Sequence, residues 1–80
     1  MKAKIHVTHK KGVLDPQGKT VESALKSLGY KNIMNLRIGK YIEIDIEGKG
    51  KEAAEKQVKE MCDKLLSNPV IEQYRYEIEQ

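Results

Sequence analysis

Three acidic residues recur at every second position near the middle of the chain, at Glu43, Asp45 and Glu47. Ile44 and Ile46 alternate with them, a pattern that predicts a β-strand with isoleucines on one face and carboxylates on the other. Successive carboxylates would then stand about 7 Å apart, a spacing compatible with metal binding or general acid–base catalysis. No histidine or further carboxylate is placed to complete such a site, so a solvated face paired with Lys and Arg is favoured.

The other reactive side chains are two histidines and one cysteine. His6 and His9 fall on opposite faces of an expected strand, which disfavours a shared metal. Cys62 excludes an internal disulfide, has no neighbouring base in the sequence, and fits a buried helical position. Residues 48–51 (GKGK) lack the Gly-Lys-Ser/Thr ending of a phosphate-binding loop and are expected to be a flexible connection. We therefore expect no catalytic residue and no metal ligand in this chain.

The most distinctive local sequence is the turn that leads into the first expected helix. Asp15 followed by Pro16 is typical of a helix start, because the carboxylate caps free amides and proline fits the first position. Gly18 is unusual in a first turn. It would permit close approach of another backbone, or mark a later start capped by Lys19 or Thr20. The helix presents an apolar stripe at Val21, Ala24, Leu25 and Leu28.

The hydrophobic periodicity predicts four strands and two helices in one domain, residues 1–80. The strands are expected at Lys2–His9, Met34–Ile38, Tyr41–Glu47 and Val70–Glu79, and the helices at Pro16–Leu28 and Lys51–Leu66. This order predicts an α+β fold, a ferredoxin-like βαββαβ two-layer sandwich with a four-stranded antiparallel sheet and both helices on one face. The expected core includes Leu14, Ala54, Val58, Met61, Cys62, Leu65, Tyr74, Tyr76 and Ile78.

Charge and hydropathy limit the class of partner. The 80 residues carry a net charge of +3, with +7 in residues 1–40 and −4 in residues 41–80. A basic front half makes nucleic acid a candidate, but the open face of the sheet would carry three carboxylates where an RNA-recognition sheet needs aromatic residues. We see no signal peptide and no long apolar run, so we expect a cytoplasmic protein without membrane contact. The short chain favours oligomerisation.

Three stretches of the sequence resemble the PurS family, the small subunit of phosphoribosylformylglycinamidine synthase (formylglycinamide ribonucleotide amidotransferase). They are residues 12–18 (GVLDPQG), 36–41 (LRIGKY) and 61–77 (MCDKLLSNPVIEQYRYE), in the same order as in the family. Residues 48–56 match least well. The resemblance implies the same α/β sandwich.

The resemblance also implies a role in a complex. PurS proteins act with a large synthetase subunit, PurL, and a glutaminase subunit, PurQ, as a glutamine-dependent C–N ligase of purine biosynthesis. The small subunit is expected to dock the other two so that ammonia passes between them. ATP and Mg are expected on the large subunit, with no cofactor in this chain, and a homodimer or tetramer is implied. The candidate contact residues are Asp15, Pro16, Gln17 and Gly18 in the turn, and Arg37, Gly39, Lys40 and Tyr41 between the middle strands.

Two other functions remain open at the level of sequence. A regulatory module of the same fold that senses a small molecule would use a pocket near the first loop and helix. A basic nucleic-acid-binding protein would use the positive front half of the chain.

Overall fold

The computed structural model describes residues 1–48 and 50–80. Its elements are β1 (Lys2–His9), α1 (Pro16–Ser27), β2 (Lys40–Asp45), α2 (Lys51–Met61), the π-helical turn η1 (Cys62–Leu66) and β3 (Glu72–Glu79). Lys49, in the expected flexible connection, lies outside the described residues. No helix in the described ranges has the length and apolar character needed to cross a membrane.

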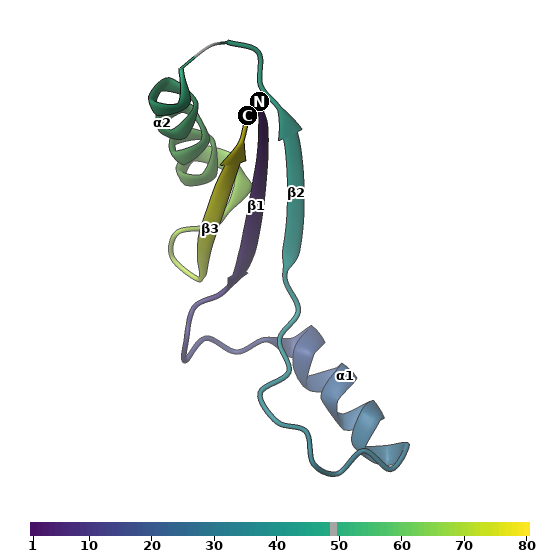
Figure 1. Ribbon diagram of the computed structural model, residues 1–80. Helices are drawn as coiled ribbons and strands as arrows, with labels where there is room; N and C mark the ends of the chain where they lie inside the picture. The colour runs from purple at the N-terminus through teal and green to yellow at the C-terminus, as the bar shows by residue number, and fades with distance from the viewer. Residues whose placement is uncertain (49) are drawn as a thin grey trace.

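The sheet has three antiparallel strands in the order β2-β1-β3 (Figure 1). In the central strand β1, Ile5 lies opposite Ile42 of β2 and Tyr76 of β3. The coarse prediction of an α+β fold with two helices is confirmed.

The fourth strand, predicted at Met34–Ile38, does not form in the described residues. This segment pairs with no strand, and Asn35 within it has a φ of 57°, a left-handed conformation that interrupts an extended strand. Two of its backbone amides bind carboxylates of the α1 region instead: Leu36 N donates to Glu22, and Ile38 N donates to Asp15. A backbone amide satisfied in this way no longer needs a neighbouring strand.

The core lies between the sheet and α2. The buried apolar residues of β1 pack with Val58 and Cys62, and Tyr74 packs against this cluster with its hydroxyl donating to Asp63 Oδ1 at 2.9 Å. The π-helical turn changes the side-chain register at the end of the helix, since Ser67 N donates to Cys62 O, five residues earlier. Leu66 therefore packs against the core, and the prediction that Leu65 is buried is wrong, because Leu65 is 82% exposed.

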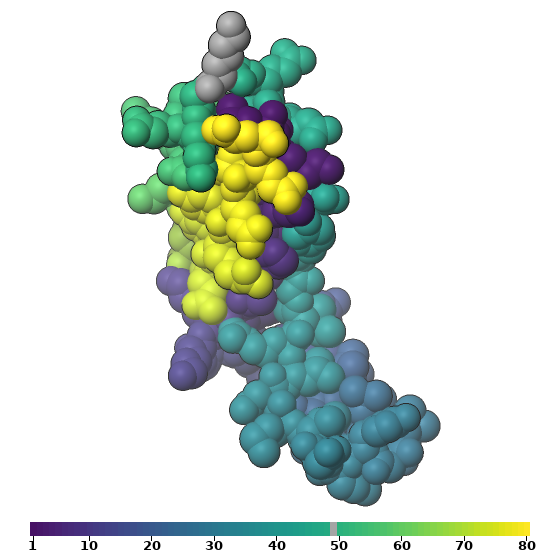
Figure 2. Space-filling view, in the orientation of Figure 1, coloured from purple at the N-terminus to yellow at the C-terminus, as the bar shows by residue number. Residues whose placement is uncertain are grey.

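The helix α1 does not cover the sheet as predicted. It lies beyond the end of the sheet and forms a second lobe with the adjoining segments (Figures 1 and 2). The molecule is accordingly elongated, with extents of 50 × 25 × 14 Å. Leu14, expected in the core, is 67% exposed, and Leu28, on the predicted apolar stripe of the helix, is 75% exposed. We call residues 10–39 the α1 lobe and the remaining described residues the body.

Candidate functional site

Asp15 connects the start of α1 to the segment that leads into β2. Its Oδ1 accepts from Gly18 N at 2.9 Å, which is the cap predicted from the Asp-Pro sequence. Its Oδ2 accepts from Ile38 N at 2.8 Å, a contact between residues 23 apart in sequence. These bonds, first that from Ile38 and then that from Gly18, lower the pKa of the Asp15 carboxyl. The carboxylate therefore holds two segments of the lobe together.

Gly18 is buried where these two segments meet. A Cβ atom built on it would stand 2.6 Å from Asp15 Oδ2 and 2.7 Å from Leu36 O. Such distances are too short for any side chain, so only glycine allows the backbone at Leu36 to approach the helix. The prediction that Gly18 permits close backbone approach is confirmed, and the alternative of a later helix start is excluded.

Glu22 makes a second link of the same kind, one that the sequence analysis missed. Its Oε1 accepts from Leu36 N at 3.0 Å, and its Oε2 lies 3.6 Å from Lys26 Nζ. The Leu36 amide is the main cause of a lowered pKa for the Glu22 carboxyl, with a smaller contribution from Lys26. Asp15, Lys19 and Glu22 stand at i, i+4 and i+7, so the polar stripe of the helix was a usable signal.

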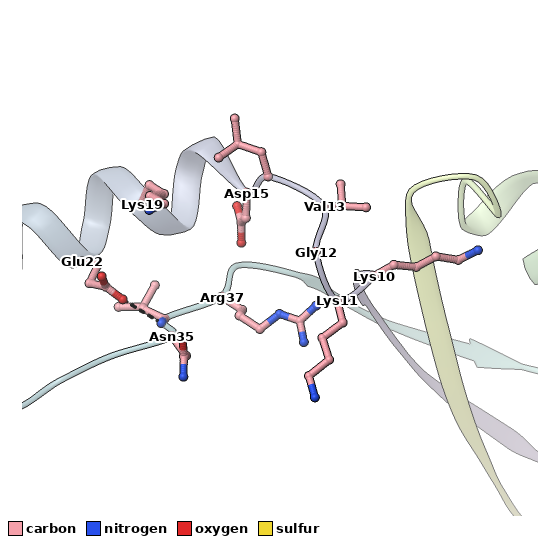
Figure 3. A pocket seen from close by; sticks show the side chains of 11 residues that line it. Lys10, Lys11, Gly12, Val13, Asp15, Lys19, Glu22, Asn35 and Arg37 are labelled. Carbon is pink, nitrogen blue, oxygen red and sulfur yellow. Dashed lines mark hydrogen bonds between the residues drawn. The ribbon is translucent and has the colours of Figure 1, made fainter.

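A cavity of about 390 Å³ lies between the β1–α1 connection and residues 35–37 (Figure 3). Arg37 reaches it from the segment that leads into β2, and Asp15 and Glu22 contribute the two carboxylates described above. Sequence reasoning also missed its three lysines, Lys10, Lys11 and Lys19. The structure thus brings Arg37 together with the turn at Asp15, as a pair of contact stretches would require.

Gln17 and Pro16 lie on a different side of the lobe. Both are exposed and line a mostly apolar depression of about 500 Å³ with Thr20, Val21 and Ile38. The turn at residues 15–18 therefore presents a polar and an apolar surface on either side of the start of α1.

The other predicted contact stretch does not form a turn between two strands. Gly39 lies in an extended connection where its backbone crowds Val7 O of β1, leaving no room for a Cβ. Lys40 and Tyr41 already belong to β2, on the body. Lys40 Nζ donates to Leu66 O at 3.4 Å, and the Tyr41 ring lies 4.8 Å from that of His6. The eight predicted residues therefore fall on two surfaces, one on the lobe and one on the sheet.

Of the side chains considered for catalysis, Glu43 takes part in an ion pair and Cys62 lies in the core. Glu43 pairs with Lys2 at 3.8 Å, as expected for a solvated acidic face. Cys62 is buried, as predicted, and its burial raises the pKa of its thiol. Across residues 1–48 and 50–80, no three His, Cys, Asp or Glu side chains gather into a set able to hold a metal ion.

Comparison with known proteins gives one consistent result. Residues 2–80 match the family model PurS, described as phosphoribosylformylglycinamidine (FGAM) synthase. The PurS subunit of this synthase from Bacillus subtilis is 52% identical over 79 residues, which cover 99% of this chain and 93% of the relative. The PurS subunit from Methanocaldococcus jannaschii is 44% identical over 78 residues, covering 98% of this chain and 94% of the relative.

Solved structures agree with the sequence comparison. The structure of B. subtilis PurS has a TM-score of 0.89 and covers 99% of this chain and 98% of its own. A chain in the structure of PurLQS from Thermotoga maritima is 38% identical with a TM-score of 0.86, covering 95% of this chain and 93% of its own. The match of sequence and fold along nearly the full chain shows that it belongs to the PurS family, the subunit PurS of phosphoribosylformylglycinamidine synthase.

Proposed function

We propose that this chain is the non-catalytic small subunit that docks a PurQ glutaminase on a PurL synthetase. Ammonia released from glutamine then passes to the synthetase, which uses ATP to convert formylglycinamide ribonucleotide to formylglycinamidine ribonucleotide. The observation that carries the proposal is the similarity to a chain of PurLQS from T. maritima along 95% of this chain. We place the complex in the cytoplasm, where purines are made.

Docking accounts for how a chain of this kind contributes to the reaction. Free ammonia is nucleophilic only while unprotonated, and in bulk water near pH 7 most of it becomes ammonium. A subunit that holds the glutaminase against the synthetase shortens the path through water. ATP and Mg²⁺ bind to the large subunit in this proposal, and this chain contributes rigid surfaces and no reacting group.

The test of docking is assembly of the three proteins. The matching PurL and PurQ proteins are mixed with ATP, Mg²⁺ and glutamine, and complexes are measured by sedimentation velocity with and without this chain. We expect a species containing all three proteins only when the chain is present. Equal association of PurL and PurQ without it would contradict the docking role.

We assign the contacts to the turn Asp15–Gly18 and to Arg37 on the lobe, and to Gly39, Lys40 and Tyr41 at the start of β2. Replacing Gln17 and Arg37 together by alanine should weaken complex formation about tenfold or more, because both side chains are exposed beside cavities. Circular dichroism should show an unchanged melting curve. A matched control replaces Gln57 and Lys51, exposed on α2, by alanine. Loss of the cooperative melt would mean that Gln17 and Arg37 maintain the fold.

We also propose that a second copy completes the four-stranded sheet and covers α1. In the described residues, β2 pairs only with β1, and an open strand edge favours pairing with another chain. Apolar surface is also exposed at Val21, Leu28 and Met34, and the small core of one chain does not bury it. Sedimentation equilibrium should give a dimer or tetramer of the 9.1 kDa chain. A mass of 9.1 kDa at every concentration would refute this.

A further inference from the structure

The α1 lobe carries the net positive charge of the molecule. Residues 10–39 contain six Lys and Arg and two Asp and Glu, a balance of +4, whereas the other residues contain nine and ten, a balance of −1. The lobe extends from one end of a molecule 50 Å long (Figure 2). Exposed charges more than about 8 Å away are largely screened at physiological salt, so a partner at the lobe is affected mainly by the charges of the lobe and of the adjoining end of the body.

Within the lobe, the positive charge gathers around the 390 Å³ cavity. Lys11, Lys19 and Arg37 line it, while the Lys10 side chain points away from Arg37 (Figure 3). No ion pair to any of these cations is found in residues 1–48 and 50–80, whereas Lys2 and Lys4 of the body pair with Glu43 and Glu79. The cations at the cavity are therefore available to a partner.

The two carboxylates at the cavity offset only part of this charge, because four cations, Lys10, Lys11, Lys19 and Arg37, line it against Asp15 and Glu22. Asp15 accepts from two backbone amides, and Glu22 accepts from a third and pairs with Lys26. Their lowered pKa values reflect this engagement. Both carboxylates are ionised, so an approaching anion meets an excess of two positive charges among the residues that line the cavity.

The neighbourhood of the cavity distinguishes between classes of anionic partner. Leu14, which lines the cavity, is 67% exposed. No aromatic side chain lines the cavity, although binding of single-stranded nucleic acid relies on aromatic stacking. Cations beside an exposed aliphatic side chain fit a protein segment in which carboxylates adjoin apolar residues.

We propose that this cavity is the docking site for an acidic, partly apolar segment of the PurL or PurQ subunit. Lys11, Lys19 and Arg37 bind its carboxylates, and Leu14 contacts its apolar side chains. This assignment rests on the proposed docking function and specifies the chemistry of the surface that the partner presents. Since the cations lie at the rim of a solvated cavity, they contribute mainly to association rate and salt dependence.

The experiment compares charge reversal in the lobe with charge reversal in the body. Lys11→Glu with Lys19→Glu is the test variant, and Lys56→Glu with Lys59→Glu, on the exposed face of α2, is the control with the same net charge. Affinity for the PurL–PurQ pair is measured at about 0.05 M and 0.5 M salt. We expect the test variant to bind at least about tenfold more weakly at low salt and within about threefold of wild type at high salt. The control should change less than about twofold.

Other outcomes would overturn the assignment. Equal weakening by both variants would point to net charge alone, and a loss that persists at high salt would point to altered structure. The neutral pair Lys11→Gln with Lys19→Gln guards against a folding defect and should give a smaller, salt-dependent loss. If a 20-base-pair DNA duplex binds the lobe and the reversal abolishes that binding but leaves the complex intact, the partner is nucleic acid. Failure of the wild-type chain itself to bind the pair would refute the docking function, whereas wild-type binding unaffected by the variants refutes only this site.

Discussion

At the level of single residues, Asp15 determines how the lobe is held together. Replacing it by asparagine keeps the shape but turns one acceptor oxygen into an amide donor, which faces either Gly18 N or Ile38 N. We expect the melting temperature at pH 7 to fall by several degrees. Asp45→Asn, an exposed position on β2, is the control and should change it little. An unchanged melt for Asp15→Asn would show that the two hydrogen bonds do not stabilise the fold.

The same residue predicts a pH dependence. The pKa of Asp15 is lowered from its ordinary value of 3.8, so the folded state binds that proton less readily than the unfolded state. The stabilisation is therefore present above pH 3.8 and is lost as the pH falls through the lowered pKa. The gap in unfolding free energy between wild type and Asp15→Asn should narrow below about pH 4. A gap that stays constant from pH 7 to pH 2 would argue against an ionised carboxylate as its cause.

Gly18 tests the close approach of α1 and the segment that leads into β2. In Gly18→Ala the new methyl group meets Asp15 Oδ2 and Leu36 O, so one of the two segments must move. We expect a loss of about 1–3 kcal/mol in unfolding free energy, measured by urea denaturation. Ser23→Ala, exposed on the same helix, should be neutral or slightly stabilising because alanine is the better helix former. A neutral Gly18→Ala would show that the lobe is looser than the structure indicates.

At the level of elements, α2 and η1 decide which side chains enter the core. Val58 is fully buried, and Leu65 is 82% exposed. Val58→Ala should therefore cost about 1.5–3 kcal/mol in unfolding free energy, and Leu65→Ala less than about 0.5 kcal/mol. Chemical denaturation of both variants measures the two values. If Leu65→Ala lowers the unfolding free energy by more than about 0.5 kcal/mol, α2 ends in a regular α-helical register and not in the π-helical turn.

The hydrophobic periodicity of the sequence was sufficient to locate the elements that depend on local interactions. It placed β1 at Lys2–His9, the start of α1 at Pro16 and the burial of Val58 and Cys62. It failed at Leu65 because a single π-helical turn rotates every later side chain, and no residue type specifies such a turn.

The unformed fourth strand has a different cause. The alternation of Met34, Leu36 and Ile38 predicts a strand, but it indicates neither the left-handed backbone at Asn35 nor the acceptors that the amides of this segment find. Here they find Glu22 and Asp15, which are 14 and 23 residues away from their donors. The candidate site was likewise predictable only in part, since Lys11 and Lys19 line the same cavity as Arg37 only once this tertiary contact has formed.

At the level of the whole molecule, the chain is a small sheet-and-helix body with a basic lobe projecting from it (Figure 1). Most of the apolar stripe of α1 is exposed, and the outer edge of β2 has no partner strand in the described part of the chain. Cys62 is buried, and the Asp15 and Glu22 carboxylates of the lobe accept hydrogen bonds from backbone amides, so these groups are not free to react. These properties suit a subunit that works through its surfaces.

The most direct test of this account compares two sources of nitrogen. Matching PurL and PurQ are supplied with ATP, Mg²⁺ and formylglycinamide ribonucleotide, and amidine formation is measured with glutamine or with ammonium chloride, each with and without this chain. We predict that glutamine-dependent turnover requires the chain, whereas ammonia-dependent turnover by PurL does not. If omission of the chain lowers both rates equally, it takes part in the synthetase chemistry, and if omission lowers neither, the docking role is wrong.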